Sequence, residues 1–319
     1  MKKTNLKPGR IFPVVSIILL LIAGSLKAEG PLMRFPDIHK DLIVFVHGED
    51  IWSVSAEGGV ANRLTMHDGQ ERFPKFSNDG SMIAFSAEYD GNTDVYVMNM
   101  YGGEITRVTF HPGSDVVIGW HPEKNKIIFS ASRENFPGLG QLYLVSPDGT
   151  GLEKLIFHEA AQGTYSPDGK HFAYNKTFRE FRTWKRYKGG RAQEIYLYDF
   201  ETDEEKNLSN FEGTDRIPMW WGDKIYFSSD RDRVLNIYSV DPAGGQIEQI
   251  TSHTEYDIRR PSIGGSRIVY ELGGKIMVLD LENGQTNEVD VQILADAPEL
   301  RPYFKDVKGN LTEISSSPD

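Results

Sequence analysis

The chain has 319 residues, of which 39% are hydrophobic and 25% are charged, and its formal net charge at pH 7 is −11. An acidic protein of this kind is a poor general ligand for nucleic acid or anionic membranes, because both attract basic surfaces. The sequence contains no cysteine, which excludes disulfide bonds, zinc–thiolate sites, a cysteine nucleophile and a lipid anchor attached through cysteine.

Residues 1–28 have the layout of a secretory signal peptide. Basic residues that include Lys2 and Lys3 precede the apolar run IFPVVSIILLLI at 11–22, and small residues follow before a cleavage point after Ala28. The apolar run is shorter than the ~20 residues that span a bilayer. We therefore expect cleavage, no membrane insertion of the mature chain, and a periplasmic or secreted protein. An uncleaved membrane anchor is the alternative.

The rest of the chain repeats one unit of four short elements. The second element of each unit is apolar, at Leu42–Phe45, Ile83–Ser86, Ile127–Ser130, Phe172–Asn175, Ile225–Ser228 and Ile268–Glu271. The third element resembles DVYV, at 50–54, 94–97, 141–145, 194–198, 236–240 and 275–279. The fourth element ends at Leu64, Val108, Leu155, Leu208, Ile250 and Val289.

All four elements of a unit have strand patterning, with NDG or PDG turns after the first element and GG or NG turns after the third. No window keeps the 3.6-residue period of a helix. Four antiparallel strands repeated every ~40–45 residues are the signature of a β-propeller blade. The sequence therefore predicts an all-β fold, a six-bladed β-propeller of four-stranded antiparallel blades over residues 29–291, preceded by the signal peptide.

Both ends of the repeat region predict how the ring closes. Blade one begins with its own first strand near Met33–Ile38, and blade six ends with its own fourth strand near Gln285–Val291. Since no strand is exchanged between these blades, we expect side-chain packing alone to close the ring. Such closure is weaker than closure by a shared strand.

Residues 292–319 have a different pattern, which we interpret as a linker and the start of a second propeller. The chain stops at SSSPD, one residue short of the SPDG turn found at Ser166–Gly169. We therefore expect this chain to be the front part of a longer polypeptide.

A basic insertion interrupts blade four. The segment FRTWKRYKGG at 181–190 lies between the second and third strands, within a window, 176–191, of seven basic residues and a single acid, Glu180. The equivalent loops of blades three and five carry Arg133 and Arg231. Because these loops share one face of a propeller, we expect a basic patch that captures carboxylates through bidentate arginines. The alternative is a set of solvated loops with local ion pairs, which contribute little energy.

Other motifs favour no metal, no cofactor and no catalytic residue in this chain. The segment HEAAQ at 158–162 lacks the second histidine of a zinc HExxH motif, DGNTD at 90–94 lacks the glutamate of a calcium loop, and no G-x-S-x-G elbow occurs. Histidines and acids recur four residues apart between blades, which suggests either a metal ring or acids that each hold their own turn. We favour the second reading for His67, His111, His158, His253, Glu71, Asp115, Asp215 and Asp257.

The sequence resembles the tricorn protease family. The resemblance is carried by the insertion at 181–190, by AQEIYLYDF at 192–200 and by RPYFKDVKGNL at 301–311, and it covers residues 32–319. It implies a large serine peptidase in which two propellers precede a catalytic region that is absent here. The first propeller would form a channel between the catalytic chamber and solvent, and supply arginines that hold the substrate's C-terminal carboxylate. The signal peptide departs from the cytosolic archaeal members.

The resemblance also implies site residues and partners. Arg133 is the nearest match to the first residue of the family's arginine pair, but Glu134 follows where a second basic residue is wanted. The candidate substrate-binding residues are Arg133, Arg182, Lys185 and Arg186. The expected partners are peptides with a free C-terminal carboxylate, downstream peptidase domains and further copies of the same chain.

A second function class fits the same repeats. Periplasmic propellers similar to TolB share the SPDG and GG elements, so this chain could instead be a self-standing scaffold that binds envelope proteins. The repeats alone do not separate the two functions.

Overall fold

The computed structural model describes residues 32–134, 140–181 and 185–295, together with Phe304, Asp306 and Lys308. Of the two units into which the chain divides, every described residue belongs to the second, Pro31–Asp319. The expected signal peptide at 1–28, the candidate Arg182 and most of the expected linker at 292–319 lie outside the described residues. Within the described ranges, no helix is long and apolar enough to cross a membrane.

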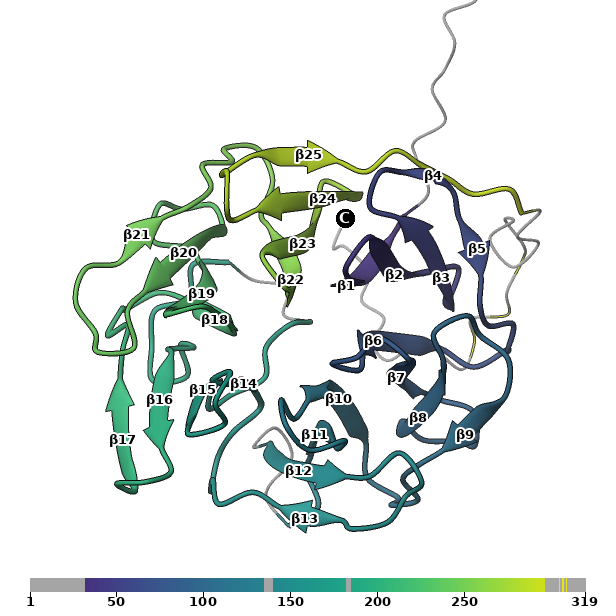
Figure 1. The fold of residues 1–319 in the computed structure, drawn as a ribbon, viewed down its shortest axis with the longest axis horizontal. Coiled ribbons are helices and arrows are strands. Elements are labelled where there is room, and N and C mark those ends of the chain that lie inside the picture. The colour runs from purple at the N-terminus through teal and green to yellow at the C-terminus, as the bar shows by residue number, and fades with distance from the viewer. Residues whose placement is uncertain are drawn as a thin grey trace, which may run out of the picture. The chain divides into compact units, whose positions relative to one another are not determined.

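The second unit is a six-bladed propeller of four-stranded antiparallel sheets, as the repeat predicts, with the first strand of each blade innermost (Figure 1). Blades one to three consist of β1 (Arg34–His39), β2 (Leu42–His47), β3 (Asp50–Ser55) and β5 (Asn62–Arg63); β6 (Glu71–Phe76), β7 (Met82–Ala87), β8 (Asp94–Asn99) and β9 (Ile105–Arg107); and β10 (Asp115–Trp120), β11 (Ile127–Ala131), β12 (Gln141–Val145) and β13 (Glu153–Lys154).

Blades four to six continue the same order. They consist of β14 (Gln162–Tyr165), β15 (His171–Asn175), β16 (Tyr196–Asp199) and β17 (Glu204–Asn207); β18 (Asp215–Trp221), β19 (Lys224–Ser229), β20 (Asn236–Val240) and β21 (Glu248–Gln249); and β22 (Arg259–Gly264), β23 (Arg267–Leu272), β24 (Lys275–Asp280) and β25 (Thr286–Glu288). Two short strands, β4 (Gly59–Val60) and β26 (Val291–Gln292), form a separate parallel pair.

The hydrophobic core lies between the blades. One cluster joins Ala84 and Val95 of blade two to Phe129 and Tyr143 of blade three, and each of the other clusters likewise contains residues of two neighbouring blades. The second and third strands are therefore buried on both faces, which is why they read as nearly continuous apolar runs instead of alternating ones.

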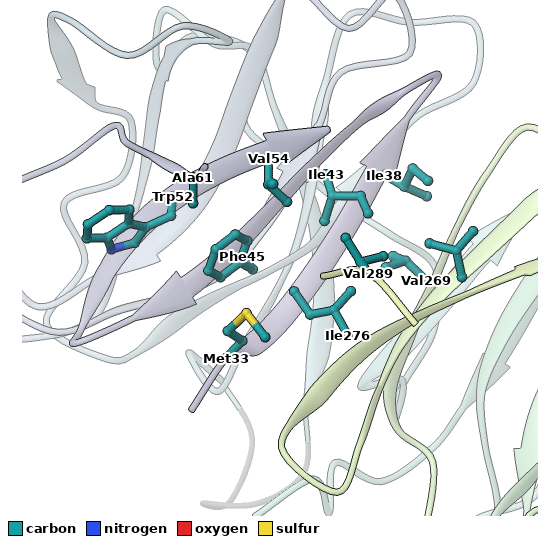
Figure 2. Packing of buried hydrophobic residues seen from close by; sticks show 11 residues of the cluster. Met33, Ile38, Ile43, Phe45, Trp52, Val54, Ala61, Val269, Ile276 and Val289 are labelled. Atoms are coloured by element: carbon teal, nitrogen blue, oxygen red, sulfur yellow. The ribbon is translucent and has the colours of Figure 1, made fainter. Parts of the chain in front are cut away.

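The seam between blades six and one is packed like the other seams. Ile43 and Phe45 of blade one face Val269, Ile276 and Val289 of blade six (Figure 2). The expectation that each of these blades supplies its own four strands is confirmed.

Closure does not depend on side chains alone, so that part of the prediction is incomplete. The parallel pair of β26 and β4 joins the end of blade six to blade one through two hydrogen bonds. The amide of Gly59 donates to the carbonyl of Asp290 at 2.8 Å, and the amide of Ala61 donates to the carbonyl of Gln292 at 2.9 Å. The chain beyond blade six thus reaches back and fixes the ring.

The innermost strands of the two blades approach even more closely, and this gives a test of the seam. A Cβ atom added to Gly264 of β22 would lie 1.9 Å from the carbonyl oxygen of Ile38 in β1. We expect Gly264→Ala to lower the free energy of unfolding by at least ~2 kcal/mol, because a backbone atom cannot move aside as a flexible side chain can. Urea unfolding of the purified chain measures this.

Gly119→Ala is the matched control, because Gly119 also lies in an innermost strand but has no atom within 4 Å of its added Cβ. Alanine is favoured over glycine in a strand by about 0.5–1 kcal/mol, so this variant should be neutral or slightly stabilised. Equal losses in both variants would show that the seam is not tightly packed.

Candidate functional site

A cavity of about 370 Å³ runs along the axis of the propeller. Its walls come from the innermost strands of all six blades, which surround the centre of the ring (Figure 1). By exposed area the lining is half polar and half apolar, with Trp120 and Trp220 among the larger side chains. One polar group in the wall joins three blades. The ammonium group of Lys75 in blade two lies 3.3 Å from the carboxylate of Asp37 in blade one and 2.5 Å from the hydroxyl of Ser262 in blade six.

Four innermost strands carry an Arg-x-Pro tripeptide at the same repeat position, beginning at Arg34, Arg72, Arg216 and Arg259. The pairing register shifts across each tripeptide, as in a β-bulge. The middle residues have left-handed backbones, with φ of 52° at Phe35, 54° at Phe73, 53° at Ile217 and 44° at Arg260. All four line the axial cavity, so the bulges aim these side chains at the axis. The repetition of Arg-x-Pro can be read in the sequence, but the candidate residues predicted from it include none of these four arginines.

The basic insertion of blade four lies across one mouth of this cavity. The ring of Phe178 lies 6.1 Å from that of Phe73, and the ring of Phe181 lies 6.0 Å from Phe73 and 6.2 Å from Phe35. Between them, Glu180 accepts a hydrogen bond from Arg216 at 3.0 Å, with both side chains at least 95% buried. Residues 178–181 of the insertion therefore pack against blades one, two and five, whereas most of 185–191 is exposed.

Arg133 is engaged within its own blade. Its guanidinium lies 2.6 Å from Asp115 and stacks over the rings of Phe129 and Tyr143, and only 12% of its side chain is exposed. Burial raises the pKa of Asp115, and hydrogen bonding to Arg133 opposes that shift. A substrate carboxylate that reaches Arg133 would therefore compete with Asp115 for the guanidinium or share it.

The same arrangement recurs in blade five, which indicates a structural role for it. Arg231 lies 2.8 Å from Asp215 and stacks over the rings of Phe227 and Tyr238. Removing one partner of such a half-buried pair leaves the other charge without compensation.

The remaining candidates lie elsewhere on the ring. The ammonium group of Lys185 is 2.6 Å from Asp257, in the connection between blades five and six. Arg186 donates to the carbonyl of Arg233 in blade five at 3.4 Å. No contact among the described residues joins Arg133 to Lys185 or Arg186, so the structure brings together the two insertion residues but not all of the candidates.

The recurring histidines and acids do not form a metal site. His67 and His111 accept hydrogen bonds from the amides of Gly69 and Gly113, both at 2.9 Å, and so close their own turns. In the part of the chain that the structure describes, no group of three or more metal-binding side chains occurs.

The acids reach further than their own turns, contrary to our expectation. Glu71 of blade two accepts a hydrogen bond from the amide of Ile51 in blade one at 2.9 Å, and Asp257 accepts one from the amide of Leu235 in blade five at 3.1 Å. These two acids therefore bind the start of the third strand of the preceding blade.

Glu71 gives a test of this role through pH. Burial raises its pKa from 4.5 to about 7, although Thr65, Tyr89 and the amide of Ile51 donate to it. The folded state thus holds this proton more tightly than the unfolded chain does. The protonated Glu71 therefore adds to the free energy of unfolding, and this contribution is fully present below pH 4.5. It is lost as the pH rises through about 7, which lowers the free energy of unfolding by about 3 kcal/mol.

We expect Glu71→Gln to abolish that pH-dependent loss, because glutamine keeps an acceptor oxygen and never ionises. The free energy of unfolding is measured for both proteins at pH 4.5 and at pH 7, and the value of the variant is subtracted from that of the parent at each pH. This subtraction removes the contribution of all other titrating groups. A difference that does not change with pH would contradict the buried, protonated carboxyl.

These features define a six-bladed all-β propeller whose axial cavity is covered at one mouth by an insertion. Residues 30–285 match the family model described as the tricorn protease N-terminal beta propeller domain. The chain therefore belongs to this family, as the insertion sequence predicts.

Two comparisons give the share of a tricorn protein's length that this chain covers. The chain is 30% identical to a tricorn protease homolog of Saccharolobus solfataricus over 304 residues, which cover 93% of this chain and 28% of the relative. The crystal structure of the tricorn protease matches with a TM-score of 0.74 and 26% identity, over 83% of this chain and 27% of that one. The chain spans roughly a quarter of the length of these relatives.

The second function class has a structural counterpart as well. TolB from Acinetobacter baumannii matches with a TM-score of 0.59 and 17% identity, over 74% of this chain and 58% of that chain. A likeness at this level of identity shows a shared fold alone.

Proposed function

We propose that this chain is the N-terminal propeller of an exported tricorn-type serine peptidase, in which it acts as a substrate or product channel and a peptide-binding scaffold without catalysing the reaction itself. The observation that carries the proposal is the match of nearly the whole propeller to the tricorn family, together with an axial cavity walled by all six blades. The relatives' greater length leaves room for a peptidase region outside this chain.

The axial cavity has the character of a peptide path. Its volume of about 370 Å³ falls within the usual range of ligand sites, which are mostly apolar with a few placed polar groups. A peptide that passes through the covered mouth must displace Phe178 and Phe181 and separate Glu180 from Arg216. Breaking a buried ion pair costs about 3–5 kcal/mol, so passage of a peptide beside Glu180 and Arg216 would need binding energy from the peptide.

The basic residues of the same face supply the second part of the proposal. Lys185 and Arg186, with Arg182 beside them in sequence, attract the free C-terminal carboxylate of a peptide, and Arg133 does so in competition with Asp115 or beside it. The partners are such peptides, peptidase domains or subunits, and further copies of the chain.

Peptide hydrolysis tests the proposal. We expect the 319-residue chain to leave fluorogenic peptides intact, because no catalytic nucleophile and base were found in its sequence. The complete product of the gene should hydrolyse them and lose that activity after treatment with a serine-directed inhibitor. A reading frame that ends at Asp319, or hydrolysis by the 319-residue chain itself, would overturn the proposal.

The scaffold function predicts a different outcome. A TolB-like protein would recover envelope proteins from a membrane extract while showing no hydrolysis in any form. The sequence match over 93% of the chain to a tricorn homolog favours the peptidase, whereas the likeness to TolB rests on the fold.

A further inference from the structure

A second cavity, of about 290 Å³, lies at the seam where blade six meets blade one. It is bordered by Arg34 of β1, Arg259 of β22, Lys185 of the insertion and Tyr256 of the connection between blades five and six. The insertion, whose role the sequence left open, thus forms one wall of a pocket whose other walls come from the ends of the propeller repeat.

The pocket has an excess of positive charge in an acidic protein. Four basic and three acidic side chains line it. Glu271 is occupied, because Arg260 donates to both of its oxygens, at 3.1 and 2.9 Å, and the amide of Phe35 donates to one of them at 2.7 Å. The carboxylate of Asp257 forms an ion pair with the ammonium group of Lys185 at 2.6 Å.

Two guanidinium groups remain without a partner. Arg34 and Arg259 are exposed, and neither makes a hydrogen bond or an ion pair with any residue that the structure describes. They differ in this from Arg216 and Arg72, which hold the same position of the Arg-x-Pro motif in other blades. Arg216 pairs with Glu180, and Arg72 donates to Gln70.

The electrostatics of the pocket show that these positive charges act on each other. Burial lowers the pKa of Arg260, and the neighbouring charge of Arg34 acts in the same direction while Glu271 and Glu180 oppose it. The guanidinium of Arg260 is bonded to Glu271, whereas that of Arg34 adds positive charge beside it. An anion placed beside Arg34 would relieve this repulsion.

We propose that Arg34, Arg259 and Lys185 form an oxyanion pocket that takes a carboxylate. Guanidinium groups bind carboxylates through two parallel hydrogen bonds, and the small volume suits the end of a chain or a small acid. This site rests on the peptide binding proposed above, because it shares Lys185 with the basic residues named there. It lies at a different seam from Arg133 and does not require peptidase activity.

Peptide binding tests the pocket directly. The probe is a tetra-alanine peptide with a free C-terminal carboxylate and an uncharged BODIPY fluorophore at its N-terminus, and its anisotropy is measured with the 319-residue chain at low ionic strength. We expect Arg34→Gln and Arg259→Gln each to weaken binding of this peptide by about tenfold or more, as for the loss of one charge-assisted contact. The C-terminal amide should bind weakly, and equally to all variants.

Lys124→Gln is the control, because it removes one positive charge from an exposed turn between β10 and β11, outside the pocket. It should leave binding unchanged. Thermal unfolding of each variant confirms folding, which exposed side chains such as Arg34 should not affect.

Two further probes identify the source of the carboxylate. Displacement of the peptide by succinate would assign the pocket to small acids as well. Tight binding of an amidated peptide with an internal glutamate would assign it to acidic side chains. Equal affinity for the free acid and its tetra-alanine amide, or affinity that does not depend on Arg34 and Arg259, would overturn the proposal.

Discussion

The whole structure depends on one constraint, which is that each blade has two apolar faces and cannot bury either of them alone. Every sheet needs a neighbour on both sides, so the row of blades is stable only when the last meets the first. The close approach of Gly264 to Ile38 and the pairing of β26 with β4 satisfy this requirement. The axial cavity follows from it, since closing the ring brings six innermost strands around one axis.

Side chains of the innermost strands and of the blade-four insertion pack against one another at this axis. Left-handed residues such as Phe35 and Phe73 cost of order 1–3 kcal/mol each, yet they recur at one repeat position. They place aromatic rings where the blade-four insertion can pack on them, and the buried pair of Glu180 and Arg216 fixes that insertion. Strain at the axis is thus offset by contacts that join blades far apart around the ring.

The basic side chains of this face fall into two classes. Arg133 and Arg231 are bound to acids and stacked on aromatic rings in equivalent places, so they stabilise their blades. Arg34 and Arg259 lie at the seam and have no such partners among the residues that the structure describes. A ligand gains most from charges that the fold has not already used, which separates the candidate binding residues from residues of the same type that hold the structure.

The sequence by itself determined the number of blades, the place of nearly every strand and the family, because strand patterning and turn residues are local and repeat with the blade. It also located the insertion. Only the tertiary structure decided that the described part of the insertion packs at the axis, that Arg133 is paired with Asp115 and that Arg34 has no partner among the described residues. Those facts depend on contacts between distant residues, such as Phe35 and Glu271, which are 236 positions apart. A local pattern carries no information about the partner that folding brings to a charged side chain.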